Sequence, residues 1–317
     1  MTAGRALAAI DRYVMAPMPA ARLGALRVLI GGFAAIYLLA RLPYLLGHTR
    51  FGAHQFDPVG AVWLLCDAPL PSGLVTGLTF LTVALAIPFA LGWRTRVTGP
   101  LFALALLWTL SYRNSWGMVF HTENLLVLHV LILAVSASGD AWSLDARRRA
   151  RTGQGLAADT VHARYGWPVR LMCWVVVIAY VLAGIAKVQN GGMSWIWGDE
   201  LRNHVALDNA RKMLLGDIYS PLAAPLMEFS TLWKALAAMT VALELGAPIA
   251  LLSRRLALGW VVGVVGFHLG VLALMMIAFP YQMVGVAFAC FFRAEKLAET
   301  RLAGWLQARW RRWRNTG

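Results

Sequence analysis

Long apolar stretches separated by short polar segments form the main pattern of this chain. Stretches that reach or approach the roughly 20 apolar residues needed to cross a bilayer lie near residues 23–46, 74–92, 97–117, 119–137, 168–187, 232–252, 256–276 and 278–292. The last stretch is short, and it predicts a tilted or partly re-entrant segment. The pattern therefore predicts an all-α, polytopic transmembrane helical bundle of about eight spans.

Composition agrees with a membrane protein. Of the 317 residues, 59% are hydrophobic and 14% are charged. Soluble globular domains carry about 25% charged residues, so this chain is too apolar for that class. Residues 1–22 contain arginines but lack a compact apolar core followed by a small-residue cleavage site, so we expect no cleavable signal peptide.

The distribution of basic residues accounts for the net charge of +14 without a nucleic acid. Arginines gather before the first apolar stretch and in alternate loops, including residues 138–167. Cytoplasmic loops collect Lys and Arg, so both termini are predicted to be cytoplasmic, while residues 47–73 and 188–231 are predicted to face outward. We expect a multi-pass protein of the cell membrane that contacts membrane lipids and binds no nucleic acid.

Cysteines and short motifs exclude several function classes. Cys66, Cys173 and Cys290 are scattered, two of them in apolar runs, and we interpret them as core residues with no disulfide framework and no metal site. The sequence contains no phosphate-binding loop, no H-E-x-x-H pair and no G-x-S-x-G elbow. ATP-driven transport, zinc proteolysis and serine hydrolysis are therefore unsupported.

Besides the C-terminal tail, three segments are expected to lie outside the spans, namely residues 47–73, 188–231 and 145–164. Residues 47–73 are semi-apolar and are predicted to pack on the bundle or re-enter it. Trp195–Gly198 is typical of an interfacial aromatic anchor, and residues 200–215 alternate polar and apolar positions at helical spacing, which predicts a short outer helix. Residues 145–164 are rich in Arg, Gly and Ala and predict a flexible loop.

The C-terminal tail has its own pattern, which places a boundary between a membrane domain over residues 1–293 and a basic tail over residues 294–317. Leu and Trp recur at threes and fours between arginines, including Trp305, Trp310 and Trp313. This pattern is typical of an amphipathic helix lying on an anionic membrane surface. A helix that binds a calmodulin-like partner is the alternative interpretation.

Lys187 is the most informative candidate for chemistry. It follows an uncharged run over residues 171–186 and precedes a polar turn. An ammonium in hydrocarbon must snorkel to the surface, pair with an anion or lose its proton. The last option lowers its pKa and makes it a base. At about 1.5 Å per residue, Lys187 lies roughly 27 Å above the cytoplasmic start of its helix.

Other polar residues are predicted to gather in the same outer half of the membrane. His121 begins the fourth stretch, His268 lies about 18 Å up the seventh, and Tyr281 follows a Phe-Pro turn. These residues are candidates to share one outward-facing pocket with Lys187. Glu244 lies near mid-membrane, where it is expected to be protonated or to pair across helices with Arg or Lys.

Structural alternatives stand beside these candidates. His121 can belong to a simple helix start, with Thr122 as cap and Glu123 at the positive end of the helix dipole. His129 is expected to be a hydrogen-bonded core histidine. For Arg27 and Arg94, near the inner face, snorkelling is the favoured interpretation.

Seven short pieces lie in a fixed order along the chain. They are Leu26–Gly32; Gly92–Arg94; Asn114–Trp116 followed by His121; Gly139–Asp145; Ala183–Val188; Trp195–Gly198; and Phe267–Leu269 leading to Phe279–Tyr281. In this order the pieces resemble the HTTM family, the membrane domain related to the vitamin K-dependent gamma-carboxylase. The resemblance runs from about residue 20 to about residue 293, so residues 1–293 are interpreted as an HTTM-like transmembrane domain.

The resemblance implies a reaction and roles for individual residues. In the carboxylase a lysine deprotonates vitamin K hydroquinone, the anion reacts with oxygen, and the resulting base allows CO2 to add to a glutamate; Lys187 matches that lysine. His121 is the nearest match to an assisting histidine, although its distance from the Ser-Trp motif is longer here, and His268 matches a second one. We assign Lys187, His121 and His268 as catalytic residues.

Cofactors follow from the same resemblance. The expected cofactor is reduced vitamin K or menaquinol, with O2 and CO2 as co-substrates if the chain is a carboxylase, and Trp195, Gly198 and Tyr281 are assigned to bind the quinol. The large domain by which the carboxylase engages its protein substrates has no counterpart here, so a small peptide or small molecule is the expected substrate.

Two hypotheses therefore remain. The first is a quinol-dependent epoxidase, oxygenase or carboxylase-like enzyme with Lys187 as base. The second is a non-enzymatic scaffold, maturation partner or transporter that uses the same embedded polar groups.

Overall fold

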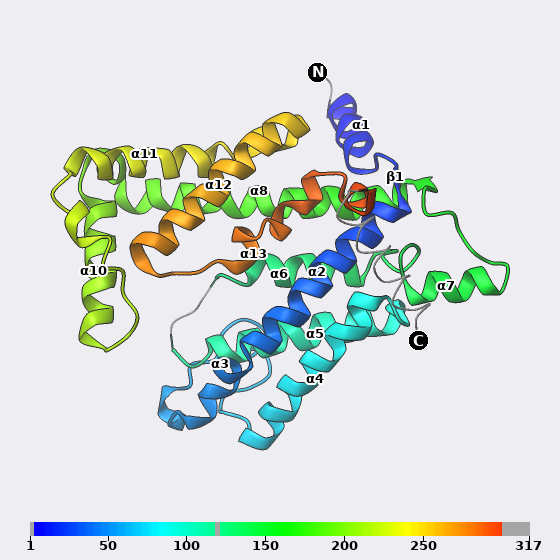
Figure 1. Ribbon diagram of the computed structural model, residues 1–317, viewed down its shortest axis with the longest axis horizontal. Coiled ribbons are helices and arrows are strands. Elements are labelled where there is room, and N and C mark those ends of the chain that lie inside the picture. The colour runs from blue at the N-terminus through cyan, green and yellow to red at the C-terminus, as the bar shows by residue number, and fades with distance from the viewer. Residues whose placement is uncertain (1–2, 118–120, 300–317) are drawn as a thin grey trace, which may run out of the picture. The chain divides into compact units, whose positions relative to one another are not determined.

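Helices dominate this protein, whose computed structural model describes residues 3–117 and 121–299 (Figure 1). The described residues contain one very small sheet, in which β1 (Met18–Pro19) pairs antiparallel with β2 (Val161–His162). The chain divides into two compact units, and each is described by itself. Unit 1 comprises Met1–Met172 and Phe292–Gly317, and unit 2 comprises Cys173–Phe291.

Unit 1 is a bundle built around α2. Its long helices pack in sequence order, α2 on α4, α4 on α5 and α5 on α6, and α6 returns to α2 (Figure 1). Its helices are α1 (Ala3–Val14), α2 (Ala20–Ala40), α3 (Leu42–Leu46), η1 (Gly47–Arg50), η2 (Ala53–Gln55), α4 (Ser72–Leu91), α5 (Thr95–Asn114), α6 (Asn124–Ala134), α7 (Leu144–Arg151), the start of α8 (Ala163–Gly191) and η6 (Ala294–Glu299).

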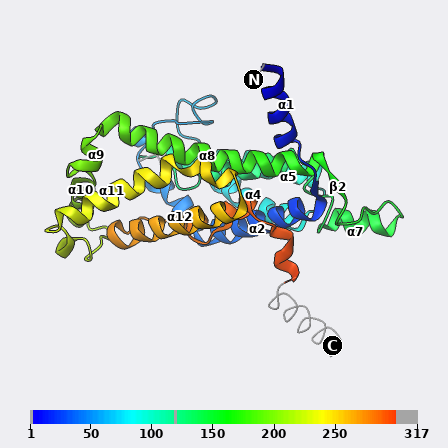
Figure 2. The ribbon, with the colours of Figure 1, turned by 90° about the horizontal axis from the view of Figure 1, so that it is seen from above.

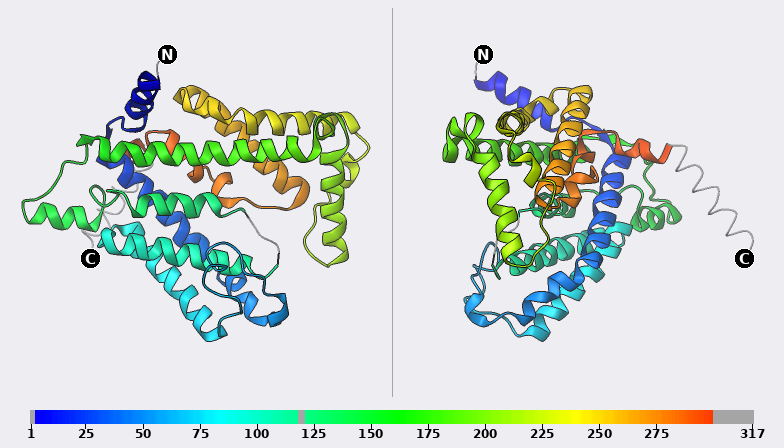
Figure 3. Two further views of the ribbon diagram at one scale, coloured as in Figure 1. Left: turned by 180° about the vertical axis from the view of Figure 1, so that it is seen from behind. Right: turned by 60° about the vertical axis from the view of Figure 1, so that its left-hand side comes forward.

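Unit 2 sets the remainder of α8 beside two further long helices, α11 and α12. The helix α10 runs across the ends of these helices, as Figures 2 and 3 show. The elements of unit 2 after α8 are α9 (Ser194–Trp197), α10 (Glu200–Leu214), η3 (Ala224–Leu226), α11 (Ser230–Leu245), η4 (Ala247–Leu251), α12 (Arg254–Met275), α13 (Pro280–Met283) and η5 (Val286–Phe291).

Four of the described helices are long and apolar enough to cross a membrane: α2, α4, α8 and α12. The apolar helix α6 is shorter than a bilayer span. The helix α5 has 20 residues, among them Arg96 and Arg113, and α11 has 16 residues, among them Lys234 and Glu244. A membrane-embedded, all-helical protein is thus supported, and the number of eight spans stays a prediction.

The predicted stretch 278–292 differs most from the structure. It forms two short helices, α13 and η5, instead of one continuous helix. Gly285 lies between them with φ of 76°, a left-handed conformation that suits glycine and ends a right-handed helix. Pro280 begins α13, because proline lacks an amide hydrogen and fits best in a first turn.

The predicted flexible loop 145–164 is wrong in its first half, which forms α7. The Ser143 hydroxyl accepts a hydrogen bond from the Ala146 amide and caps this helix, and three arginines lie in its last turn, where they complement the helix dipole. The second half of the segment ends in β2, and the Ala20 amide donates to the Thr160 carbonyl. The segment is therefore fastened at both ends.

The segment 47–73 packs on the bundle, as predicted. Val62 forms a buried cluster with Tyr112 and Trp116 of the α5 end. The Asp57 amide donates to the Ser115 carbonyl, and the Leu70 amide donates to the Tyr112 hydroxyl. Backbone amides of this irregular segment thus find protein partners, as an environment without water requires.

The chain after unit 2 returns to α2. Arg22 donates to both carboxylate oxygens of Glu295 in η6, at 3.0 and 2.7 Å. Burial raises the pKa of the Glu295 carboxyl, but the Arg22 hydrogen bonds and charge outweigh burial and leave the pKa lowered. The predicted amphipathic helix of the tail, with its three tryptophans, lies outside the described residues.

Candidate functional site

Lys187 forms an ion pair with Glu244 inside unit 2. The Lys187 Nζ lies 2.5 Å from Oε1 and 2.6 Å from Oε2 of Glu244, so both carboxylate oxygens accept from the ammonium (α8 and α11 in Figure 1). The Lys187 side chain is 22% exposed and the Glu244 side chain is 4% exposed. The expectation that Glu244 pairs across helices is confirmed, and its partner is the lysine that the sequence singled out.

Small residues make this pairing possible. Gly184 lies one helical turn before Lys187, and a Cβ atom at Gly184 would lie 2.8 Å from Leu245 Cδ2 and 3.1 Å from Glu244 Cβ. Only glycine allows α8 and α11 to approach this closely without a shift. The Ala-Gly-Ile-Ala-Lys sequence therefore combines a contact surface for α11 with the lysine that pairs across it.

Trp195 covers the pair from the short helix α9. The Lys187 Nζ lies 5.7 Å from the centroid of the Trp195 ring, within the range of a cation–π contact. His204 of α10 lies beside the Trp195 ring, and the two ring centroids are 5.3 Å apart. The Trp195 Nε1 atom is buried and has no hydrogen-bond partner among the described residues. Within the described chain, the indole N–H is therefore an unsatisfied buried donor.

His268 belongs to a second polar pair. The Tyr180 hydroxyl and the His268 Nε2 lie 2.7 Å apart, and Phe279 packs on the imidazole at 4.6 Å between centroids. Tyr180 lies two turns of α8 before Lys187, which is about 10 Å along the helix. The structure therefore places His268 and the Phe279–Tyr281 turn together, about 10 Å from the Lys187 pair along the axis of α8.

Two further residues assigned to bind the quinol, Tyr281 and Gly198, lie at different helices of unit 2. Tyr281 is buried in α13, at 2% exposure. Gly198 ends α9, and its amide donates to the Ser194 carbonyl at 2.7 Å. A Cβ atom at Gly198 would lie 2.5 Å from that carbonyl oxygen, so this position requires glycine for a local turn. A binding role for Gly198 and Tyr281 stays a prediction.

His121 lies in unit 1, in the exposed turn before α6. The carboxylate of its neighbour Glu123 accepts from the Tyr37 hydroxyl of α2 at 2.5 Å and from the Thr122 hydroxyl at 2.5 Å. The Thr122 hydroxyl therefore binds the Glu123 side chain and does not cap α6. The N-cap residue of α6 is Glu123, and its side chain makes no capping hydrogen bond. His129 is fully buried with a hydrogen bond to the Met172 backbone, as the core interpretation expects.

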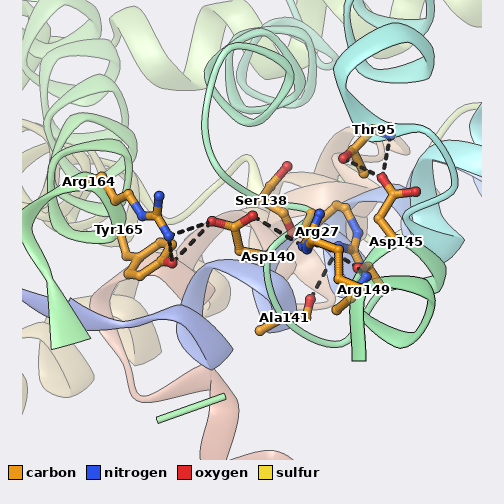
Figure 4. A network of polar contacts seen from close by, with 12 residues as sticks. Arg27, Thr95, Ser138, Asp140, Ala141, Asp145, Arg149, Arg164 and Tyr165 are labelled. Atoms are coloured by element: carbon orange, nitrogen blue, oxygen red, sulfur yellow. Dashed lines mark hydrogen bonds and ion pairs between the residues drawn. The ribbon is translucent and has the colours of Figure 1, made fainter. Parts of the chain in front are cut away.

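Arg27 is the residue whose role the sequence analysis missed. Snorkelling was expected, but the guanidinium is fully buried. It donates to the Ser138 and Trp142 carbonyls at 2.6 Å each and to the Ala90 and Ala141 carbonyls at 3.4 Å each (Figure 4). Five fixed donors in one plane allow a single arginine to serve several carbonyls. Arg27 thus connects α2 to the last residues of α4 and to the segment that follows α6.

Asp140 and Asp145 organise the polar residues around Arg27 (Figure 4). Asp140 pairs with Arg149 at 3.2 Å and with Arg164 at 3.0 Å. Asp145 accepts from the Arg94 amide and from the Thr95 amide and hydroxyl, each at 2.8 Å, and so caps the start of α5. Burial raises the pKa of Asp145, but these hydrogen bonds and the Arg149 charge outweigh burial and lower the pKa below its usual value.

Comparison with known proteins decides the family. A model of the HTTM domain matches residues 15–295. The chain belongs to the HTTM family. No curated protein and no solved structure matches it. Five of the seven family pieces recognised in the sequence fall at two places in the HTTM domain. Those at Leu26–Gly32, Gly92–Arg94 and Gly139–Asp145 meet around Arg27, whereas those at Ala183–Val188 and Trp195–Gly198 meet around Lys187.

Proposed function

We propose that this HTTM protein is a membrane-embedded, quinol-dependent enzyme in which the Lys187–Glu244 pair accepts the quinol proton. The observation that carries the proposal is the position of the pair: an ammonium and a carboxylate in an apolar helix contact, with a tryptophan ring over the ammonium. Ionisable residues within a membrane domain mark functional sites by default, because their burial is costly. The proposal includes the non-spanning α9 as part of the binding site.

The pair can act as one proton acceptor. It holds a single shared proton, carried by the amine in the ion pair. The Lys187 ammonium passes a proton to the Glu244 carboxylate, and the amine then takes the proton of a quinol hydroxyl. Glu244 ends protonated, and the restored Lys187 ammonium stabilises the negative charge of the quinol oxygen. Lys187 is then the electrostatic partner of the anion, and Glu244 is the residue that holds the proton.

The surroundings fit a quinol, for which reduced vitamin K and menaquinol are the proposed identities. A quinol supplies two-electron chemistry with oxygen when bound. The buried Trp195 Nε1–H can donate to a quinol oxygen, and the exposed side chains of Val188 on α8 and Leu245 on α11, next to the pair, provide an apolar surface for an isoprenoid tail. The proposal extends to a carboxylation that uses CO2 as the last step of the reaction, as the family resemblance implies.

Quinol-dependent oxygen uptake by the purified protein in lipid nanodiscs tests the proposal, with menaquinol and reduced vitamin K as probes. Lys187→Arg retains a positive charge beside Glu244 but cannot release its proton, so uptake should fall to background. Lys212→Arg is the matched control, because Lys212 is also buried and paired, with Asp208 at 2.7 Å, and should retain uptake. Full uptake by Lys187→Arg would show that Lys187 is not part of the acceptor.

A structural role for the pair is the second candidate. Both oxygens of Glu244 bind the same ammonium, which is the geometry of a clamp between α8 and α11. A non-enzymatic scaffold, maturation partner or transporter needs only that clamp. The reversed pair Lys187→Glu/Glu244→Lys discriminates the two roles. If the pair is only a clamp, the reversed protein should fold and function in cells. If the pair is the proton acceptor, reversal moves the ammonium away from Trp195 and quinol-dependent oxygen uptake should be lost.

A further inference from the structure

A basic cavity in unit 1 is separate from the Lys187 site and has no role in the proposed reaction. It has a volume of about 430 Å³ and lies where α5 and α8 begin and the segment after α6 ends. We propose that this cavity binds a phosphate group, either in the headgroup of an anionic phospholipid or as a free phosphate. Its charged lining residues are Arg94, Arg96, Asp140, Asp145, Arg149 and Arg164.

The charges of the lining do not balance. Arg149 and Arg164 both pair with Asp140, and Asp145 is occupied by the start of α5. Neither Arg94 nor Arg96 has an ion pair with any residue of the described chain, and both side chains are exposed to the cavity side of the surface. Two guanidinium groups therefore remain to bind an anion at the edge of a cavity.

The backbone of Arg94 is held in place by its neighbours. Arg94 has φ of 47°, an unfavourable left-handed conformation for a residue with a side chain. Two contacts maintain it: Asp145 binds the Arg94 amide, and Gly92 fits against Arg27, where a Cβ atom would lie 2.8 Å from the guanidinium carbon. Strain of this kind persists where the surroundings fix it, and it occurs preferentially at binding sites.

Phosphate is the anion that suits this arrangement. A planar guanidinium group donates two parallel hydrogen bonds to two oxygens of the same phosphate or carboxylate. The start of α5 is already capped by Asp145, so the helix end itself is closed to a second anion and the arginine side chains form the site. A volume of about 430 Å³ exceeds a bare phosphate and accommodates a glycerophosphate headgroup.

Apolar residues beside the cavity favour the lipid as the source of the phosphate. Leu91, Trp93 and Val97 are exposed next to Arg94 and Arg96, and α4 ends and α8 begins at this level, so the cavity lies at the border of the apolar helices. Acyl chains can lie on these residues while the headgroup occupies the cavity. Exposed tryptophan and arginine at such a border are typical of lipid contact.

The test measures thermal stability of the purified full-length chain in neutral detergent, with three probes. These are dioctanoyl phosphatidylglycerol, dioctanoyl phosphatidylcholine and inorganic phosphate. The variant Arg94→Gln/Arg96→Gln removes the two unpaired guanidinium groups. The matched control Arg147→Gln/Arg148→Gln removes the same charge from exposed residues of α7 that do not line the cavity.

The expected result is saturable stabilisation by phosphatidylglycerol, with an affinity for the cavity variant about tenfold weaker or more, since each charge-assisted bond contributes that much. The control variant should bind as the unchanged chain does. Equal stabilisation by inorganic phosphate supports the site with free phosphate as its ligand. Equal weakening in both variants, equal stabilisation by phosphatidylcholine, or no stabilisation by any probe would overturn the proposal.

Discussion

Gly184 of α8 lies so close to Glu244 of α11 that a Cβ atom at Gly184 would be 3.1 Å from the Glu244 Cβ. Replacement by alanine gains about 1 kcal/mol of helix propensity, but overpacking costs about 1–3 kcal/mol. We expect Gly184→Ala to lower stability and to separate Lys187 from Glu244. Gly266→Ala, with nothing within 4 Å of its Cβ position, should keep or raise stability. Equal melting temperatures of the two variants would contradict this close contact.

The two members of the ion pair should respond differently to removal. Lys187→Met leaves the Glu244 carboxylate buried, at 4% exposure, whereas Glu244→Gln leaves a lysine that is 22% exposed and can reach toward water. Loss of one partner of a buried pair costs about 3–5 kcal/mol. We therefore expect Lys187→Met to be the more destabilising variant, and the double variant Lys187→Met/Glu244→Gln to recover part of the loss. Additive losses in this double-mutant cycle would show that the two residues do not interact.

Arg27→Lys should be severely destabilising although the charge is kept. One ammonium cannot reach the four carbonyls that Arg27 serves, and each buried carbonyl left without a donor costs about 1–3 kcal/mol. We expect a loss of about 3 kcal/mol or more, measured by denaturation in mild detergent. Arg41→Lys, at the other end of α2, should change stability by less than about 1 kcal/mol, because its cation–π contact with Tyr44 is one that lysine also makes.

Because of Asp145, the free energy of unfolding should decrease at acid pH. Its folded-state pKa is lowered from the ordinary value of 3.8, so its contribution is present above about pH 4 and disappears as the pH falls through the folded-state pKa. The melting temperature of the unchanged chain should therefore fall between pH 5 and pH 3. Asp145→Asn should be less stable at pH 7 and should lose less on acidification. Parallel pH profiles would exclude Asp145 as the residue responsible.

The predicted topology is testable with single cysteines on a background in which Cys66, Cys173 and Cys290 are alanine. Gly153 follows α7 and Asn203 lies on α10, and both positions are exposed. The distribution of arginines predicts that Gly153→Cys is labelled from the cytoplasmic side and Asn203→Cys from the outer side. Reaction of both cysteines with a membrane-impermeant reagent in intact cells would contradict that topology.

Helical periodicity and apolar length predicted the helix content and the long helices α2, α4, α8 and α12. They could not predict the break at Gly285, because the left-handed turn is decided by local backbone strain and not by hydrophobicity. They also missed α7, because its run of arginines resembles a flexible loop, whereas Ser143 caps the helix. Both failures arise where a single residue outweighs the composition of its segment.

The candidate site was partly accessible from sequence. The position of Lys187 after an uncharged run identified it, and Glu244 had to find a basic partner, but nothing in either helix alone shows which one. The roles of Arg27 and Arg94 were inaccessible, because their partners are separated from them by tens of residues and include backbone carbonyls, which carry no sequence signal. A residue that binds main-chain atoms leaves no complementary residue to recognise.

The carbonyls that hold Arg27 also set an order of events during synthesis. Ser138 follows Arg27 by 111 residues, so at translation rates of roughly 5–20 residues per second α2 waits about 6–22 seconds for that partner. Until Ala90 emerges, 63 residues after Arg27, the guanidinium has none of its four carbonyl acceptors, and hydrocarbon does not tolerate it. The nascent helix α2 must therefore remain at an aqueous or chaperone-protected boundary until the helices α4, α5 and α6 have emerged.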